Sequence, residues 1–462
     1  MIARARVAAF DIVKTVAAGR DDLPAAIARS RRTLDDDRDK ALAAEIATGV
    51  ERWRASLDYL IEAASARRID RLDPEIAAIL RLSAYQLLHL TRVPAAAVVD
   101  DAVELTRKAK KRSASGFVNA VLRTLSRQRA ALSLPPRPAD AADRAAALDY
   151  FSITLSHPRW LVSRWLDRFG FADTERWLQF NNAHARLTLR ANRLRIAREA
   201  LADRLAAHEI SVSPGRFAPD ALIVESGQPL GLAPGLIDDG SFVVQDEASQ
   251  IVSLLVDAHA GDRVLDCCAS PGGKTTAIAA AMSDRGLIVA ADVRQRRIDL
   301  LRRTVTSSGA TTVRIVQADA AAPLPFSSPF GRVLLDAPCS GLGTLRRDPD
   351  IRWRRREEDL AILASAQTQM LGHAAACVAP GGRLVYATCS SEPEENERVV
   401  DDFLASTDSF ALVDARTIAG VAADVVDPRG CLRTLPHRHG LEAFFGAVLQ
   451  RRAGAAGSTK TV

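Results

Sequence analysis

Two cysteines stand directly after apolar runs that are typical of buried strands. Cys339 follows Leu334-Leu335-Asp336-Ala337-Pro338, and Cys389 follows Val385-Tyr386-Ala387-Thr388. A lone cysteine after a strand is more often structural than reactive. Two strand ends of an open α/β sheet, however, can share one edge, which is where active sites of such sheets lie. The pair therefore predicts thiol chemistry in a shared crevice, with Asp336 beside it.

A third strand end carries a glycine-rich turn, Asp266-Cys267-Cys268-Ala269-Ser270-Pro271-Gly272-Gly273-Lys274-Thr275. A phosphate-binding P-loop would need glycine at Cys268, and the three spaced glycines of a dinucleotide fingerprint are also absent. A nucleoside pocket without strong phosphate recognition remains, against the alternative of an ordinary α/β turn. Asp292 ends the next apolar run, about 20 residues past the glycines, where a carboxylate would bind ribose hydroxyls. Adenosine without phosphates indicates S-adenosyl-L-methionine.

These groups match what methylation of cytosine at C5 requires. C5 is a poor nucleophile, and a thiolate that adds to C6 makes C5 able to attack a sulfonium methyl group. The C5 proton must then leave so that the thiol can be eliminated, and an aspartate would steady the base. Spacing does not decide whether Cys339 or Cys389 adds to C6. A cation such as Lys274 would favour the thiolate form.

The composition is that of an ordinary globular protein. The 462 residues, 48% hydrophobic and 26% charged, correspond to roughly three domains. No apolar run approaches the ~20 residues of a membrane span, and the first residues lack the apolar block of a signal peptide. We therefore expect a cytoplasmic protein with no membrane partner. None of the six cysteines forms a CxxC pair, which predicts free thiols and no metal site.

Basic charge is concentrated in the N-terminal part. Residues 1–130 hold 24 Lys or Arg against 17 Asp or Glu, whereas the remainder holds 38 against 39. An excess confined to one part of the chain indicates a polyanionic partner. The cluster from Arg107 to Arg112 is predicted at a helix end. Nucleic-acid contact through Lys110 and Lys111 and a merely solvated surface are equally open there.

Periodicity and composition predict a multidomain chain. Residues 1–130 show helical spacing throughout, residues 131–150 form a Pro/Ala-rich linker, and residues 151–238 form a small α+β subdomain. Residues 239–452 alternate apolar strands with helices, as in a Rossmann-like doubly wound α/β sheet. The last strand, Ala443 to Leu449, has no helix after it and is expected as an antiparallel edge strand. The small, polar tail 453–462 is expected to be disordered.

In the small subdomain, Asn181, Arg190 and Asn192 could line an RNA path, and ordinary polar surface explains them equally well.

The first 130 residues resemble the NusB-like RNA-binding fold, which implies an all-α RNA-binding module. Several separate segments match in the right order: Asp39 to Gly49, Ile79-Leu80-Arg81 with Tyr85 to Leu88, Val93-Pro94 with Asp101 to Leu105, and Phe117 to Arg123.

The catalytic part resembles the RsmB/Sun family of RNA cytosine-5 methyltransferases. The matching motifs are Asp266 to Thr275, Asp336-Ala337-Pro338-Cys339-Ser340-Gly341, Thr388-Cys389-Ser390 with Glu394-Glu395-Asn396-Glu397, and upstream His157 to Val162 and Gln245 to Ser249. With the NusB-like part, the resemblance covers roughly residues 1–452. Two departures are small: Ser270 stands where alanine is usual, and Glu442-Ala443 where Asp-Gly is typical.

The resemblance implies that S-adenosyl-L-methionine donates a methyl group to a cytosine of small-subunit (16S) rRNA, of the 967 type. It assigns Cys389 as the nucleophile, Cys339 as the group that assists product release, and Asp336 as the holder of the cytosine edge. Asp292 would bind the ribose and Asp319 the adenine amino group. It implies no metal, and no obligate protein partner is evident. The predicted donor-binding residues are Cys268, Ala269, Ser270, Pro271, Gly272, Gly273, Lys274, Asp292, Asp319 and Asp336.

An arginine-rich stretch follows Cys339, from Arg346 to Arg356, and includes Trp353. Beside a nucleobase pocket, such residues favour phosphate contact and stacking. We predict RNA contact for Arg346 and Arg347. The alternative is a solvated helix start after Pro349 with Trp353 packed inside.

Three other functions are weighed against this one. A DNA cytosine-5 methyltransferase also uses a proline-cysteine motif, but it needs neither Cys389 nor a NusB-like domain. A tRNA-directed relative is harder to exclude. A non-catalytic RNA-binding assembly factor would have no need to keep Asp336, Cys339 and Cys389 together. Donor binding with methyl transfer to RNA would separate these possibilities.

Overall fold

The computed structural model describes residues 2–129, 131, 133–227 and 239–454, which form two compact units. The first unit is Met1–His184 together with Leu345–Glu357, and the second is Ala185–Thr344 together with Glu358–Val462. The chain thus leaves the second unit shortly after Cys339, adds one short segment to the first, and returns.

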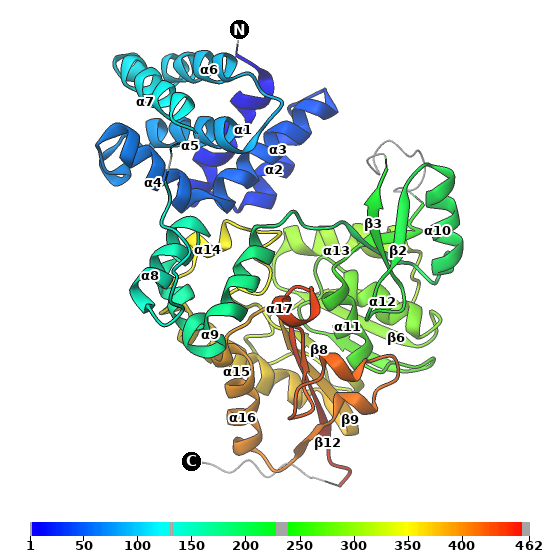
Figure 1. Cartoon of the computed structure of the whole chain (residues 1–462). Helices are drawn as coiled ribbons and strands as arrows, with labels where there is room; N and C mark the ends of the chain where they lie inside the picture. Colours follow the sequence, from blue (N-terminus) through cyan, green and yellow to red (C-terminus); the bar gives the residue numbers. More distant parts are fainter. Residues whose placement is uncertain (1, 130, 132, 228–238, 455–462) are drawn as a thin grey trace. The chain divides into compact units, whose positions relative to one another are not determined.

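The N-terminal part of the first unit is all helical, as predicted (Figure 1). Helix α5 is its most buried element, because Ile76, Ile79, Leu80 and neighbouring apolar residues all pack into one core. The helix begins after Asp73, whose side chain accepts a hydrogen bond from the backbone N–H of Glu75. The helices are α1 (Arg4–Ala17), α2 (Leu23–Arg31), α3 (Asp37–Arg52), α4 (Arg54–Ser65), α5 (Pro74–His89), α6 (Ala95–Lys108) and α7 (Ser115–Arg127).

Three further helical segments complete the α-helical part that precedes the first strand: α8 (Arg144–Asp149), the π-helical turn η3 (Tyr150–Thr154) and α9 (Arg159–Asn182). The end of the predicted linker is therefore helical, because Asp143 caps α8 by accepting from the N–H of Ala146. Helix α9 bends at Gly170, whose φ of 73° lies outside the helical range. The residues predicted as one subdomain, 151–238, fall into both units, and 228–238 lie outside the described residues.

The segment Leu345–Glu357 is built into the first unit through Arg352, on α14 (Ile351–Arg354). Arg352 is fully buried and donates hydrogen bonds to the carbonyl of Ser156 and to Asn182 Oδ1, both at 3.0 Å. Burial lowers the pKa of Arg352 to about 9. Trp353 donates from Nε1 to the carbonyl of Glu51 at 2.6 Å. The packed alternative for Trp353 is confirmed.

The second unit contains a small antiparallel sheet with strand order β2-β3-β1-β4. Leu189 and Leu222 of the sheet pack against Leu201 and Leu205 of α10. The fourth strand pairs with β1, so the sheet reaches past the predicted boundary at residue 238. The elements are β1 (Thr188–Ala191), α10 (Arg198–Ala207), β2 (Ser211–Pro214), β3 (Ala221–Ser226) and β4 (Phe242–Val244).

The predicted Rossmann-like sheet follows, with strand order β10-β12-β9-β8-β5-β6-β7, and β11 pairs with β12. Strands β9, β8, β5, β6 and β7 are parallel, and β12 runs antiparallel to β9. The elements are α11 (Glu247–Leu255), β5 (Arg263–Asp266), α12 (Gly273–Ala281), β6 (Leu287–Asp292), α13 (Gln295–Ser308), β7 (Val313–Gln317), β8 (Phe330–Asp336), α15 (Asp359–Ala376), β9 (Val378–Thr388), α16 (Glu397–Ser406), β10 (Phe410–Val413), β11 (Leu432–Arg433), α17 (Pro436–His439) and β12 (Phe445–Arg451).

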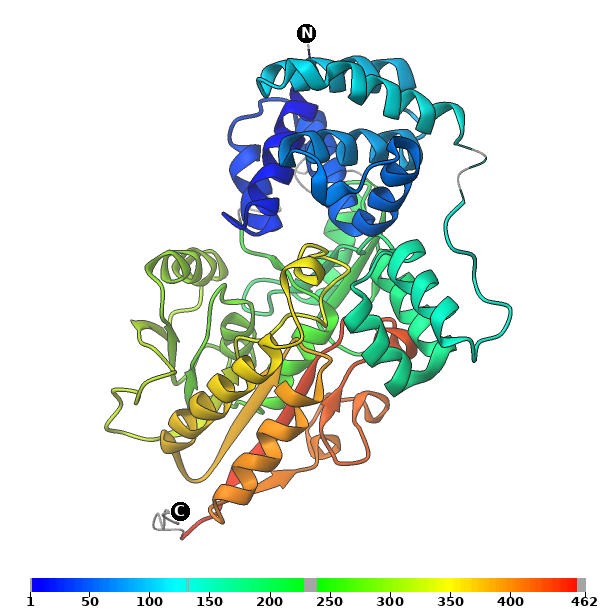
Figure 2. The same cartoon turned by 90° about the vertical axis from the view of Figure 1, so that its left-hand side faces the viewer.

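Helices cover both faces of this sheet, because successive strand residues point to opposite sides. Val264 of β5 belongs to the core formed with α11, α12 and α13, whereas Leu265 belongs to the core formed with α15 and α16. Figure 2 shows α15 and α16 lying together over one face. This is the two-faced packing of a doubly wound fold.

The late strand corrects one detail of the prediction. It is antiparallel, but it is not at the edge, because the short strand β10 pairs with its outer side from Phe410 to Val413. Only four residues long, β10 is too short an apolar run to have been recognised from periodicity. The late strand also begins at Phe445 instead of Ala443. The tail predicted to be disordered lies outside the described residues from 455 onward.

Candidate active site

The three predicted strand ends meet at one edge of the large sheet. Strands β5, β8 and β9 are parallel neighbours, with Asp266 paired to Leu334 and Asp336 paired to Ala387. Because parallel strands carry their C-terminal ends to the same edge, the glycine turn and the two cysteine loops leave the sheet side by side. The strand order therefore brings together the three loops that the sequence predicted to share one site.

The two cysteines of these loops are in direct contact. Cys339 Sγ and Cys389 Sγ lie 3.2 Å apart, within hydrogen-bonding distance for thiols, and both side chains are partly buried. The hydrogen bond with Cys389, then burial, then the negative charges of Cys389 and Glu395 raise the pKa of Cys339 well above its usual value. The contact with Cys389 and burial therefore favour the thiol form of Cys339.

Lys274 pairs with Asp336 at this edge. The ammonium donates to Asp336 Oδ2 at 2.6 Å, and the side chains are only 13% and 27% exposed. Burial opposes the charge on Lys274, but the Asp336 carboxylate outweighs it, and the pKa of Lys274 is raised, with a smaller contribution from Cys389. The predicted cation is thus bound by the Asp336 carboxylate, and Cys389 makes only a smaller electrostatic contribution to its pKa.

The glycine turn is held in a shape that its residues dictate. Gly272 precedes α12 with a φ of +103°, and a Cβ at this position would lie 2.9 Å from Leu301 Cδ1. Thr275 Oγ1 donates to Asp266 Oδ2 at 2.7 Å, and the backbone N–H of Ser270 donates to Asp292 Oδ2 at 3.2 Å. Two carboxylates from β5 and β6 therefore fix the two ends of the turn.

Carboxylates at three successive strand ends suit a nucleoside with amino and hydroxyl donors. Asp292 is buried at the end of β6, and Asp319 is exposed after β7, where it accepts from the N–H of Ala321. Asp266 Oδ1 is buried and has no hydrogen-bond partner among the described residues. Burial raises the pKa of Asp266 to about 7. The residues present therefore fit the donor predicted from the sequence.

Arg190 is buried and forms hydrogen bonds that support the glycine turn, so it does not line an exposed RNA path. It is 3% exposed and donates to Gln245 Oε1 and Thr276 Oγ1, both at 2.8 Å, and to the carbonyl of Gly273. Burial lowers its pKa to about 10. Asn181 and Asn192 are likewise buried, at 1% exposed. Both alternatives for these three residues, an RNA path and ordinary polar surface, are wrong, because all three side chains are buried.

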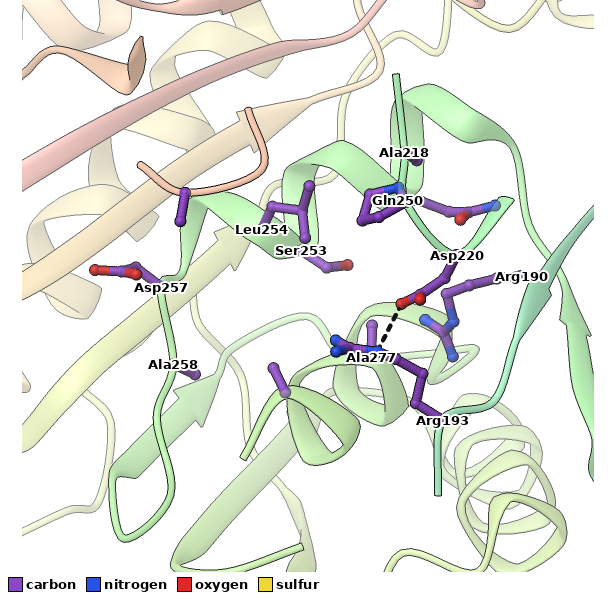
Figure 3. Close-up of a pocket in the computed structure, with 13 residues that line it drawn as sticks. Arg190, Arg193, Ala218, Asp220, Gln250, Ser253, Leu254, Asp257, Ala258 and Ala277 are labelled. Atoms are coloured by element: carbon purple, nitrogen blue, oxygen red, sulfur yellow. Dashed lines mark ion pairs between the residues drawn. The ribbon is translucent and has the colours of Figure 1, made fainter. Parts of the chain in front are cut away.

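A cavity of about 120 Å³ adjoins Arg190, between β1, α11 and α12 (Figure 3). An ion pair between Arg193 and Asp220, 2.9 Å long, lies at its side. Gln250 Oε1 and Ser253 Oγ in its wall are buried without a partner among the described residues. The space suits a few water molecules bound to these polar atoms.

The predicted RNA-contact residues have contrasting surroundings within the first unit. The Arg346 guanidinium lies 4.0 Å from the centre of the Phe180 ring, and Arg347 is half-buried. Lys110 is exposed, whereas Lys111 forms an ion pair of 2.5 Å with Asp73.

Glu395 is a residue of the site that sequence reasoning missed. It is fully buried and bonded to both cysteine loops through Ser340 and Ser390. The run Glu394-Glu395-Asn396-Glu397 contained it, but spacing does not tell which glutamate turns inward. The short turn η5 (Pro393–Glu395) decides this.

Neither a metal centre nor a membrane segment was found in the part of the chain that the structure describes. No three His, Cys, Asp or Glu side chains there are grouped to hold a metal ion. None of the described helices combines the length and the apolar character needed to cross a bilayer.

The protein has the Rossmann-like fold of S-adenosylmethionine-dependent methyltransferases. Three family descriptions match consecutive parts of the chain: the NusB family over residues 3–127, the RsmF/B-like ferredoxin-like domain over 157–231, and the 16S rRNA methyltransferase RsmB/F over 253–450.

Curated relatives match over nearly the full length. The chain is 33% identical to the ribosomal RNA small subunit methyltransferase B of Pseudomonas putida, covering 98% of this chain and 99% of that one. It is 31% identical to the probable ribosomal RNA small subunit methyltransferase B of Bacillus subtilis, covering 90% and 91%. The crystal structure of PH0851 superposes with a TM-score of 0.80 at 26% identity, covering 98% and 99%. The chain belongs to the RsmB/F family of 16S rRNA methyltransferases.

Proposed function

We propose that the protein transfers a methyl group from S-adenosyl-L-methionine to C5 of a cytosine in 16S rRNA, at the position equivalent to cytosine 967. The observation that carries this proposal is the contact of Cys339 and Cys389, 3.2 Å apart at neighbouring strand ends. A methyltransferase that attacks an oxygen or an exocyclic nitrogen needs no thiol. Methylation at C5 needs one thiol to activate the ring and a second group to assist release.

The surroundings of the two sulfurs support Cys389 as the nucleophile. Cys389 is among the groups that raise the pKa of Lys274, whereas the charge of Glu395 is among those that raise the pKa of Cys339. A thiolate is stabilised by a nearby cation and destabilised by a nearby carboxylate. The family resemblance gives the same order, which spacing in the sequence left open.

In the proposed reaction the Cys389 thiolate forms a bond to C6, and the C5–C6 electron pair becomes available at C5. S-adenosyl-L-methionine supplies the methyl group as an electrophilic sulfonium. Asp336, held by Lys274, accepts hydrogen bonds from the cytosine edge and fixes the ring. After methylation a base accepts the C5 proton, the C5–H electron pair re-forms the C5–C6 double bond, and the Cys389–C6 bond breaks to release the Cys389 thiolate. Cys339 assists this last step as an acid or base in contact with Cys389.

Donor binding falls to the glycine turn and the carboxylates beside it. Residues 268–274 hold the methionine end, Asp292 the ribose hydroxyls and Asp319 the adenine amino group. The buried, unpaired Oδ1 of Asp266 offers one further acceptor.

RNA binding is assigned to the helical module 1–130 and to the arginine-rich segment after Cys339. Lys110 is available for a phosphate because it is exposed. Arg346 and Arg347 remain predicted contacts, with the Arg346 guanidinium already oriented by Phe180. Action on ribosomal RNA agrees with the cytoplasmic location predicted from the sequence.

Bisulfite sequencing tests the proposal directly. Small-subunit rRNA from cells lacking the protein, incubated with the purified chain and donor, is expected to gain one protected cytosine. Bulk tRNA treated in parallel is expected to gain none. Protection of a cytosine in tRNA alone would show that the substrate is tRNA and not rRNA. Protection in neither RNA would contradict C5 methylation of RNA.

A further inference from the structure

The two cysteine loops share one buried carboxylate, which takes part in no step of the mechanism above. Glu395 closes the turn η5, shortly after Cys389, and its side chain is fully buried. An ionised carboxylate inside a protein is costly unless hydrogen bonds satisfy it. The donors that satisfy Glu395 come from both loops.

Each carboxylate oxygen of Glu395 accepts two hydrogen bonds. Oε1 accepts from the backbone N–H of Ser340 at 2.7 Å and from Gln367 Nε2 at 3.0 Å. Oε2 accepts from Ser340 Oγ and from Ser390 Oγ, both at 2.5 Å. Ser340 follows Cys339 and Ser390 follows Cys389, so the carboxylate is bonded to the residue next to each thiol.

Glu395 is itself held by the sheet and by α15. Tyr386 of β9 donates from its hydroxyl to the Glu395 carbonyl at 2.5 Å. Gln367 of α15 also donates to the Pro338 carbonyl at 2.9 Å, which binds the start of the Cys339 loop to the same network. Backbone and side chain of Glu395 therefore have fixed positions, as a brace between two loops requires.

We propose that Glu395 is a positioning residue, whose carboxylate ties the Cys339 loop to the Cys389 loop and so keeps the two sulfurs in contact. It acts through Ser340 and Ser390, not on the substrate. The catalytic consequence rests on the proposed function, but the geometric role does not, because it concerns the spacing of the thiols in the free protein.

The spacing can be measured without RNA or donor. Diamide takes one hydrogen from each of two neighbouring thiols, so that a disulfide forms and the diazene becomes a hydrazine. The rate at which the Cys339–Cys389 linked peptide appears, followed by mass spectrometry, reports how often the sulfurs meet. The full chain is compared with Glu395→Ala, Glu395→Gln and the double variant S340A/S390A. Glu247→Gln is the matched control, because Glu247 is also buried and accepts from backbone N–H groups, of Phe217 and Ala218.

We expect the linking rate to fall at least tenfold in Glu395→Ala and in S340A/S390A. Glu395→Gln is expected to retain most of the rate, because the serine hydroxyls can turn to accept from its amide. Glu247→Gln is expected to link like the original chain. Donor affinity is expected to change less than twofold in all four. Turnover should fall with the linking rate at nearly unchanged KM for RNA, a split that general loss of structure would not produce.

Two results would overturn the proposal. One is an unchanged linking rate in both Glu395→Ala and S340A/S390A with donor binding intact. The other is an equal loss in Glu247→Gln, which would make the effect one of stability. If Glu395→Ala does not fold, the serine double variant alone decides. The two claims can also fail separately. If the original chain makes no 5-methylcytosine but the variants still link slowly, the proposed function is contradicted and the positioning role of Glu395 is supported.

Discussion

The two halves of the candidate site are built differently. The thiol half places its chemistry in a few side-chain atoms, with the Cys339 and Cys389 sulfurs 3.2 Å apart and Lys274 bonded to Asp336. The donor half is mainly a backbone turn, shaped by Gly272 and fixed at several separate points. Function concentrated in single atoms is lost by single substitutions, whereas recognition spread over a turn is weakened in steps. The site should therefore respond very unequally to mutation.

The largest effect is expected for Cys389→Ala, because no other group takes over the bond to C6. Turnover should fall by at least about 10⁴-fold, as for removal of other catalytic nucleophiles. The covalent RNA adduct should disappear as well, measured on a denaturing gel with 5-fluorocytosine RNA. Cys377→Ala is the matched control, since it removes a buried thiol at the opposite end of β9. Residual turnover above a hundredth of the original would contradict the assignment.

The variant Cys339→Ala distinguishes the role of Cys339 from that of Cys389. The adduct should still form, but its release should slow by about 10²- to 10³-fold, the usual contribution of a general acid or base. RNA-linked protein should therefore accumulate in single-turnover reactions with ordinary RNA and donor. If the adduct is lost in this variant but persists in Cys389→Ala, Cys339 is the nucleophile and Cys389 assists release.

Asp336→Asn tests the point where the halves meet. It removes the charge that holds Lys274 and one acceptor for the base, so kcat should fall by roughly 10²-fold, as for other single electrostatic contacts. Because the turn itself is untouched, donor affinity should change little in equilibrium titration. Asp299→Asn, exposed on α13, serves as the control. A donor affinity reduced as much as kcat would place Asp336 in the donor half.

The difference between the halves also decides what the sequence could predict. Cys339, Cys389 and the glycine turn follow apolar runs, and parallel strands bring such ends together, so periodicity sufficed to place them at one edge. The buried residues that hold these loops in place, Arg190 and Glu395, could not be predicted from periodicity. Arg190 comes from a different sheet, and Glu395 is one of several glutamates in its run, so only the folded chain shows that each turns inward. Strand β10 was missed for a similar reason, since its pairing with β12 is decided by tertiary contact.

A smaller effect is expected on the donor half from Asp292→Ala. It removes the acceptor that the ribose would use and the bond from the Ser270 N–H. Loss of hydrogen bonds to a charged group costs about 1.5–3 kcal/mol, or roughly 10- to 100-fold in donor Kd. Adduct formation with RNA should persist, because the thiols are unchanged. Equilibrium titration with the donor and the adduct gel measure the two halves separately. Loss of the adduct here would show that the halves are not independent.

The effect expected to be smallest on turnover and donor binding is one on stability, the pH dependence that the buried Asp266 contributes. Burial raises its pKa to about 7 from an ordinary 3.8, so the folded chain keeps a proton that the unfolded chain loses between these values. The stabilisation is fully present below about pH 4 and is lost as the pH rises toward 7, by at most about 1.4 kcal/mol per pH unit. Asp266→Asn cannot titrate and keeps an acceptor for Thr275 Oγ1. The thermal midpoint should therefore fall less between pH 5 and pH 8 in the variant than in the original chain, with Asp299→Asn as control. Equal pH profiles would mean that Asp266 is already ionised at pH 5, and that the first strand end of the donor half carries a charge before the donor binds.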